Sequence, residues 1–174
     1  MSKMVNSNRN PAAHLAMLLM LLLPACNTTD STSSFGNPLA PIDLPEHVEP
    51  YPDNQVLQVA KARFAEGNFG HAARYYERAV EVAPQNGEAW LGLAAAYDQV
   101  RRFDLADRAY GEAGRYLGHR AEYYNGIGYS YMLRGDLAKA HSHFLKAQEL
   151  DPSNPTISNN LQMLRDALAQ ARQG

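Results

Sequence analysis

The sequence predicts an all-α fold, in which three tandem helix pairs and a C-terminal capping helix stack into an α-solenoid. Two observations carry this prediction. The second half of the 174-residue chain is similar to itself at a shift of 34 residues, and such a period is typical of helical repeat arrays. Within each period, apolar residues recur at three- and four-residue spacing, so each expected helix has one apolar stripe to bury.

Residues 1–25 have the pattern of an export signal. Lys3 and Arg9 precede an apolar run from Ala12 to Leu23. As a helix this run would be about 18 Å long, which is shorter than the roughly 30 Å hydrocarbon core of a bilayer. A cleaved signal peptide is therefore favoured over a membrane-spanning helix.

The end of this segment, Leu23-Pro24-Ala25-Cys26, resembles the lipobox of bacterial lipoproteins, although Pro24 departs from the usual residue. The resemblance implies that Cys26, the only cysteine of the chain, is acylated and anchors the protein. Asn27 follows it in place of the Asp that marks inner-membrane retention in the enteric sorting rule. The resemblance therefore implies a bacterial cell envelope protein, lipid-anchored in the outer membrane and facing the periplasm. The alternative is a secreted protein with a chance cysteine.

Residues 26–52 are predicted to be the lipidated Cys followed by a disordered tether. Five prolines and a cluster of Ser and Thr leave this stretch too little apolar surface to offset the entropy of ordering it. Its acids have no basic partners within the segment, so the tether is expected to carry negative charge.

The repeats are predicted at 53–86, 87–120 and 121–154, and residues 155–171 are predicted to form the cap helix. Small residues occupy equivalent positions in all three repeats, where a larger side chain would overpack a helix contact at a cost of about 1–3 kcal/mol. These residues are Ala72, Ala106 and Ala140, and then Ala79, Ala113 and Ala147. The cap has an apolar stripe of Ile157, Leu161, Leu164 and Leu168, and it covers the last apolar face of the array.

The pattern resembles the tetratricopeptide repeat, in which W-x2-L-G-x2-Y is followed by A-x3-F and by P. The third repeat matches it with Tyr124, Ile127, Gly128, Tyr131, Ala140, Phe144 and Pro152. The second repeat matches it with Trp90, Leu93, Ala94, Tyr97, Ala106 and Tyr110. The resemblance covers residues 53–154 together with the cap, and it implies protein–protein interaction as the activity.

Composition and motifs favour a protein that is not an enzyme. Sixteen basic against eighteen acidic residues give no basic face for nucleic acid, and one cysteine excludes a multi-cysteine metal site. His141 and His143 would point in different directions on one helix and cannot share an ion without further partners. No catalytic residue, metal, cofactor or small-molecule substrate is therefore expected.

A partner-binding surface is expected on the concave face, because the resemblance implies that the first helix of each repeat lines it. The candidate residues are Leu57, Lys61, Phe64, Glu88, Leu91, Asp98, Asn125, Tyr129 and Met132. They suggest an apolar groove with an acidic rim, which would suit an amphipathic helix or an extended apolar segment with basic flanks. Members of the family that hold acidic chaperone tails place Lys, Arg and Asn here, and this chain has few of them. The alternative is that some of these side chains pack against the cap or against neighbouring helices.

The stretches NGEAWLGLAAAYDQVRRFDLADRAYGEA and YYNGIGYSYMLRGDLAKAHSHFLKAQELDPSNPTISNNL resemble the TadD-type lipoproteins of tight-adherence (Flp) pilus assembly. This resemblance implies an adaptor that acts as a pilot factor for the outer-membrane secretin of the pilus. The alternatives are a scaffold for peptidoglycan enzymes, a factor in outer-membrane protein assembly and, more distantly, an accessory of a periplasmic enzyme.

Overall fold

The predicted all-α solenoid is confirmed by a computed structural model that describes residues 40–171. This part of the chain contains seven helices and no strand. The helices are α1 (Val56–Ala65), α2 (Phe69–Val82), α3 (Gly87–Gln99), α4 (Phe103–Leu117), α5 (Ala121–Leu133), α6 (Leu137–Leu150) and α7 (Pro155–Ala171). The signal segment 1–25, Cys26 and the first part of the predicted tether lie outside the described residues.

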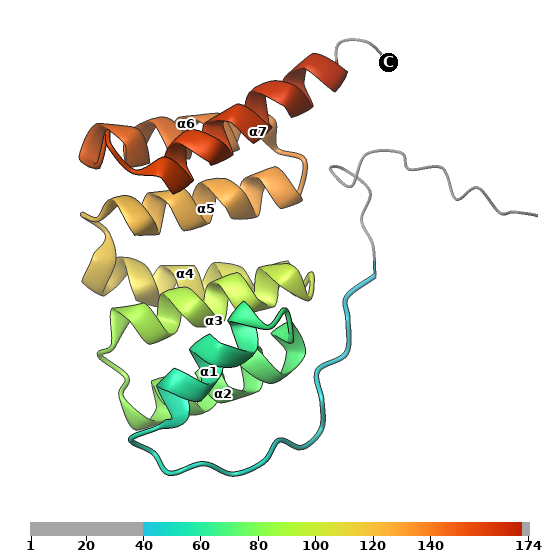
Figure 1. The fold of residues 1–174 in the computed structure, drawn as a ribbon, viewed down its shortest axis with the longest axis vertical. Helices are drawn as coiled ribbons and strands as arrows, with labels where there is room; N and C mark the ends of the chain where they lie inside the picture. Colours follow the sequence, from blue (N-terminus) through green and yellow to red (C-terminus); the bar gives the residue numbers. More distant parts are fainter. Residues whose placement is uncertain (1–39, 172–174) are drawn as a thin grey trace, which may run out of the picture. The chain divides into compact units, whose positions relative to one another are not determined.

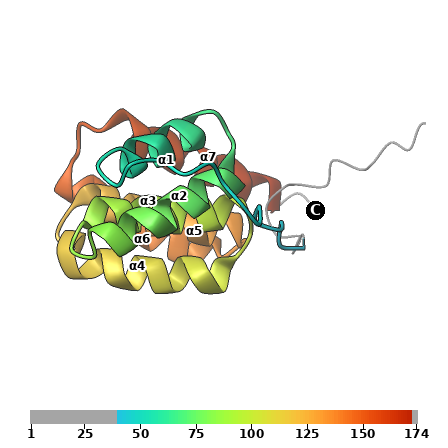
Figure 2. The same cartoon turned by 90° about the horizontal axis from the view of Figure 1, so that it is seen from below.

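The helices stack in chain order as antiparallel pairs (Figure 1). The pairs α1–α2, α3–α4 and α5–α6 correspond to the three predicted repeats, and α7 packs on α6 at the end of the stack. The first helices of successive pairs also contact one another, α1 with α3 and α3 with α5, and α5 contacts α7. In the view from below, α1 and α7 lie along one side and α4 lies along the opposite side (Figure 2).

Short turns join the two helices of each pair. Gly67 and Gly135 occupy equivalent positions in the first and third pairs and have φ angles of 75° and 79°. Arg101 takes the same left-handed conformation in the second pair with φ 60°, at a cost of roughly 1–2 kcal/mol for a residue with a Cβ. Two helices start at polar caps, α3 at Asn86 and α6 at Asp136, since each of these side chains accepts a hydrogen bond from a backbone N–H three residues later.

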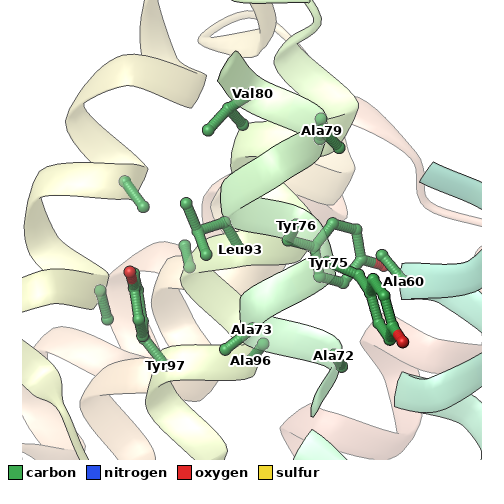
Figure 3. Packing of buried hydrophobic residues seen from close by; sticks show 14 of the residues in the cluster. Ala60, Ala72, Ala73, Tyr75, Tyr76, Ala79, Val80, Leu93, Ala96 and Tyr97 are labelled. Atoms are coloured by element: carbon green, nitrogen blue, oxygen red, sulfur yellow. The ribbon is translucent and has the colours of Figure 1, made fainter. Parts of the chain in front are cut away.

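The buried apolar side chains form two cores, one on each side of the junction between the second and third repeats. The N-terminal core is built from α1–α4, and Figure 3 shows Tyr75 and Tyr76 of α2 projecting toward α1, where Ala60 lies. The C-terminal core is built from α5–α7, with Phe144, Ile157 and Leu164 among its most deeply buried members. A cluster of polar side chains occupies the junction between the two cores.

Residues 40–52, here called the strap, differ from the disordered tether that the sequence predicts. Ile42 donates a backbone hydrogen bond of 2.9 Å to Val100, and the Tyr75 hydroxyl donates one of 3.0 Å to the Glu49 carbonyl. Leu44 and Val48 are half-buried against the N-terminal core. The strap runs along the α1–α4 helices to the start of α1 (Figure 1), so its two apolar side chains gain a surface that the local sequence does not reveal.

Candidate functional site

The first helices of the repeats carry two adjoining pockets, which together are called the groove. One pocket of about 270 Å³ lies between α3, α5 and the start of α7. The other, of about 380 Å³, lies between α3 and the turn that joins α4 to α5. Both are lined by Leu91 and Glu122, so they form one continuous surface. The remaining lining residues are Glu88, Ala95, Leu117, Arg120, Asn125, Gly126, Asn154, Thr156 and Ile157.

The floor of the groove is apolar. Leu91 and Ala95 lie one helical turn apart on α3, and Ile157 enters from the first turn of α7. At Gly126 of α5, a Cβ would lie 3.3 Å from the Leu91 side chain and 3.2 Å from the Tyr110 ring. Because a glycine stands here, the α5 backbone itself forms part of the floor, and the pocket is deeper than it would be with a larger residue.

The rim of the groove holds charges in pairs rather than the free acidic charge that the sequence suggests. Lys61 contacts Glu88 at 2.7 Å, joining α1 to α3, and Arg120 contacts Glu122 at 3.3 Å. Both pairs are largely exposed, so each contributes at most about 1 kcal/mol to stability. Their main effect is to leave the rim close to neutral.

Two predicted site residues are corrected by the structure, because both are buried. Asp98 is 2% exposed and Met132 is fully buried. Met132 belongs to the C-terminal core, and Asp98 lies between α4 and α5. Neither side chain can contact a partner from the surface.

The other predicted residues remain half-buried or exposed, but only some of them line the groove. Leu91, Glu88 and Asn125 do so. Leu57 and Phe64 pack against the N-terminal core, where the Phe64 ring meets Phe69 edge-on at 5.1 Å.

Side chains of the third repeat also pack inward, as the alternative interpretation of the sequence expected. Tyr129 packs against the C-terminal core. The Asn125 side chain accepts a hydrogen bond of 2.9 Å from Asn160 of α7, which ties α5 to the last helix. Asn125 is therefore both a lining residue and a structural contact.

Sequence reasoning missed the part of the groove that α7 and its preceding turn provide. From the sequence, Asn154 is the last residue of the third repeat, and Thr156 and Ile157 belong to the cap helix, whereas the structure places all three in the lining of the groove. The available signal was that the cap occupies the place that the first helix of a fourth repeat would have, so its first turn continues the concave face.

A largely buried polar cluster adjoins the groove at Gly126, whose carbonyl accepts a hydrogen bond from Tyr110. It is called the Asp98 cluster and consists of Asp98, Tyr110, Ser130 and Arg134. The Asp98 carboxylate is contacted by the Tyr110 hydroxyl at 2.9 Å and by the Ser130 hydroxyl at 2.7 Å. Arg134 donates to Ser130 at 2.9 Å and pairs with Asp107 at 2.6 Å. Burial raises the pKa of Asp98 to about 6, although the hydroxyl donors and Arg134 act to lower it.

The described residues offer little for catalysis or metal binding. Between residues 40 and 171 no three His, Cys, Asp or Glu side chains gather closely enough to hold a metal ion. His143 is stacked between Tyr124 and Tyr131, and burial lowers its pKa. Nor is any helix in the same range sufficiently long and apolar to cross a bilayer.

Comparison with known proteins identifies the repeats. Family models described as the tetratricopeptide repeat match residues 53–96 and 121–154, so the type of repeat that the sequence resembles is recognised in both parts of the array. Human Tetratricopeptide repeat protein 7B is 31% identical over 100 residues, which are 58% of this chain and 12% of that protein. This chain therefore spans about an eighth of that curated relative.

Two solved structures share the fold. The first TPR domain of Spaghetti (RPAP3), bound to the HSP90 peptide SRMEEVD, has a TM-score of 0.58 at 22% identity, covering 72% of this chain and 99% of that one. The type III secretion chaperone SycD of Yersinia enterocolitica, in complex with a peptide of the translocator YopD, has a TM-score of 0.56 at 19% identity, covering 69% and 92%. At these identities the similarity concerns the fold.

Proposed function

We propose that this chain, in which tetratricopeptide repeats are recognised, is a non-catalytic adaptor that binds a segment of a partner protein in the groove. The observation that carries the proposal is the pair of adjoining pockets with an apolar floor on the face formed by α3, α5 and α7. Two proteins of the same fold bind peptides, and this supports the assignment of the activity class.

The partner segment is apolar and carries little net charge. Leu91, Ala95 and Ile157 present an apolar floor, and apolar anchors that fill pockets commonly dominate the binding energy of an interface. The rim adds little electrostatic preference, because Lys61 and Arg120 are each paired with a glutamate. An acidic tail such as the one held by the RPAP3 domain would find no unpaired lysine or arginine among the lining residues and would meet Glu88 and Glu122.

At a finer level, the chain is a lipoprotein anchored through Cys26 in the outer membrane, where the groove holds a segment of a tight-adherence (Flp) pilus secretin during assembly. The lipobox-like sequence and the resemblance of the repeats to TadD-type lipoproteins support this assignment. Palmitate is among the acyl chains expected on Cys26. A peptidoglycan-enzyme scaffold and a factor in outer-membrane protein assembly are the other assignments compatible with the same groove.

A matched pair of substitutions tests the groove. Ala95→Arg places a long charged side chain in the pocket between α3, α5 and α7, whereas Ala138→Arg makes the same change on the exposed surface of α6. We expect Ala95→Arg to abolish co-purification of the secretin with the tagged protein, and Ala138→Arg to leave it unchanged. Circular dichroism of both variants verifies the fold. Equal capture of the secretin by the two variants would contradict the proposal. If Ala95→Arg instead abolishes co-purification of a peptidoglycan hydrolase, the scaffold assignment is favoured.

A further inference from the structure

The junction between the second and third repeats combines apolar contacts with a set of polar side chains. Tyr123 and Ile127 of α5 pack against the N-terminal core, and Asp98 of α3 is hydrogen-bonded to Tyr110 and Ser130 beside them. The N-terminal core ends with residues of α4, and the C-terminal core begins with Ala121 at the start of α5. Between them, the Asp98 cluster joins α3 to α4 through Tyr110 and joins α3 to α5 through Ser130. Asp98 and Tyr110 are almost entirely buried, so the protonation state of this cluster affects the contact between the repeats directly.

Counting protons in the cluster shows that a neutral Asp98 completes it. The Tyr110 hydroxyl lies 2.9 Å from Asp98 Oδ2 and 3.0 Å from the Gly126 carbonyl oxygen. An ionised Asp98 leaves one hydroxyl proton for two acceptors on different helices. A proton on Asp98 Oδ2 lets Asp98 donate to Tyr110, and Tyr110 then donates to Gly126, while Ser130 still donates to Asp98 Oδ1 at 2.7 Å. The chain of hydrogen bonds then runs unbroken from α3 through α4 to α5.

We propose that the Asp98 cluster is a proton-dependent latch, which closes the junction between α3–α4 and α5 when Asp98 is protonated and loosens it when Asp98 is ionised. The charged and titratable groups that face Asp98 are Tyr110 and Asp107 from α4 and Arg134 at the end of α5. Arg134 lies 3.8 Å from Asp98 but 2.6 Å from Asp107. It is therefore a stronger partner for Asp107, and the ionised Asp98 is only partly compensated.

The direction of the pH dependence follows from burial. The pKa of Asp98 is raised to about 6 in the folded chain, above its ordinary value of 3.8. The folded state therefore holds this proton more tightly than the unfolded state does. The stabilising contribution is complete below the unfolded pKa and is lost as the pH rises through 6.

The state of the latch should also affect the groove, and this consequence rests on the proposed function. Gly126, whose carbonyl is the end of the chain of hydrogen bonds, lines the pocket between α3 and α5. Loosening the junction changes the separation of the two helices that form that pocket. Partner binding is therefore linked to pH through Asp98, whereas the latch itself is tested without any partner.

Urea unfolding of the full chain between pH 4 and 8 tests the latch, with Asp98→Asn as a mimic of the protonated carboxyl. The measured quantity is the folding equilibrium constant of the parent divided by that of D98N. As the pH is lowered from 6 to 4, we expect this ratio to rise about tenfold per pH unit, which is on the order of a hundredfold in total. Asp104→Asn, an exposed change at the start of α4, is the matched control. The ratio of the parent to this variant should not rise in the same way. A ratio for D98N that stays constant from pH 7 to 4 would overturn the proposal.

If D98N does not fold, the protonation of Asp98 can be measured directly by carboxyl-carbon NMR of the parent chain. One aspartate should titrate with a midpoint near pH 6, and Ser130→Ala should raise that midpoint by removing a donor to the ionised carboxylate. Titration of every aspartate near its ordinary value would contradict the latch.

A distance measurement tests whether the junction itself responds. Spin labels at positions 82 and 142, both exposed and on opposite sides of the junction, are introduced as cysteines with Cys26 changed to Ser. We expect the distance distribution to be narrow at pH 5 and broader at pH 7.5, and to remain narrow at both values in D98N. The proposal is contradicted if Asp98 titrates near pH 6 but the distance distributions do not change with pH, because protonation would then not close a latch.

Discussion

Single residues at the helix contacts explain the small side chains of the repeat pattern. A Cβ at Gly128 of α5 would lie 2.6 Å from the Phe144 ring, and one at Gly92 of α3 would lie 2.3 Å from the Tyr76 ring. Each glycine thus accommodates an aromatic ring from a second helix of a repeat. At Gly128 the repeat pattern predicts a small residue, and the position of the Phe144 ring supplies the physical reason. Gly92 falls at a position that the pattern does not specify, so its small size is explained by the structure alone.

Gly128→Ala and Gly111→Ala should have opposite effects on stability. Gly128→Ala overpacks the fully buried Phe144 and should lower the free energy of unfolding by about 1–3 kcal/mol. Gly111 is exposed within α4, where an added Cβ meets nothing within 4 Å, so Gly111→Ala should raise the free energy of unfolding by about 0.5–1 kcal/mol. Urea denaturation measures both, and a neutral Gly128→Ala would contradict the packing at this site.

Asp98 shows where residue-level reasoning from the sequence ends. Its repeat position predicts an inward-facing, solvent-exposed carboxylate. The residues that bury it, Tyr110 and Ser130, lie 12 and 32 positions away. Tyr110 matches the repeat pattern as a packing residue, and no local pattern marks Ser130 as a partner of Asp98. Their meeting depends on how one repeat packs on the next, and no helical periodicity encodes that contact.

Among the elements, α7 has two structural roles. Its apolar side covers the C-terminal core through Ile157, Leu161 and Leu164. Its first turn also forms the end of the groove through Thr156 and Ile157. The apolar stripe was sufficient to predict the cap, whereas the groove wall depends on the angle at which α7 leaves α6.

The strap is the element for which sequence and structure differ most. Its backbone oxygens accept hydrogen bonds from α2 and from the turn between α3 and α4, including one of 2.9 Å from Arg74 to Pro45. Pro45 passes so close to α2 that a Cβ at Gly70 would lie 3.1 Å from its ring. If the chain is anchored through Cys26, the docked strap shortens the segment that separates the anchor from the repeats.

Replacing both apolar side chains of the strap should destabilise the domain. Leu44→Ala combined with Val48→Ala removes half-buried contacts with the N-terminal core and should lower the free energy of unfolding by about 1–2 kcal/mol. Proteolysis within residues 40–52 should accelerate in the same variant. Glu46→Ala, an exposed change in the strap, is the matched control and should alter neither quantity. If the double variant behaves like this control, the strap does not contribute to folding.

At the scale of the whole molecule, the 34-residue period predicted the six helices of the repeats, because each has a fixed place in the period. The seventh helix was predicted from its own apolar stripe. The site was predicted less completely. The period identifies the helices that face inward, so Glu88, Leu91 and Asn125 were found. It does not show that Lys61 neutralises Glu88 or that Asn125 is bonded to Asn160, because both contacts join different helices.

The two cores and the groove together give the chain its proposed role. The apolar floor crosses the junction between the cores, with Leu91 on one side and Gly126 and Ile157 on the other. A bound segment would therefore contact both halves of the array. In the proposed function, its affinity would depend on their relative position, so the stacking of the repeats would determine the recognition of a partner.

Site-specific photocrosslinking in intact cells tests the groove most directly. A photoreactive residue at position 122 or 156, both exposed and on the rim, reports contacts in the groove, and one at position 138 on α6 reports contacts elsewhere. We expect positions 122 and 156 to capture the same partner, identified by mass as a secretin segment, and position 138 to capture none of it. Capture of that partner from position 138 alone would contradict the central claim that the groove is the binding surface.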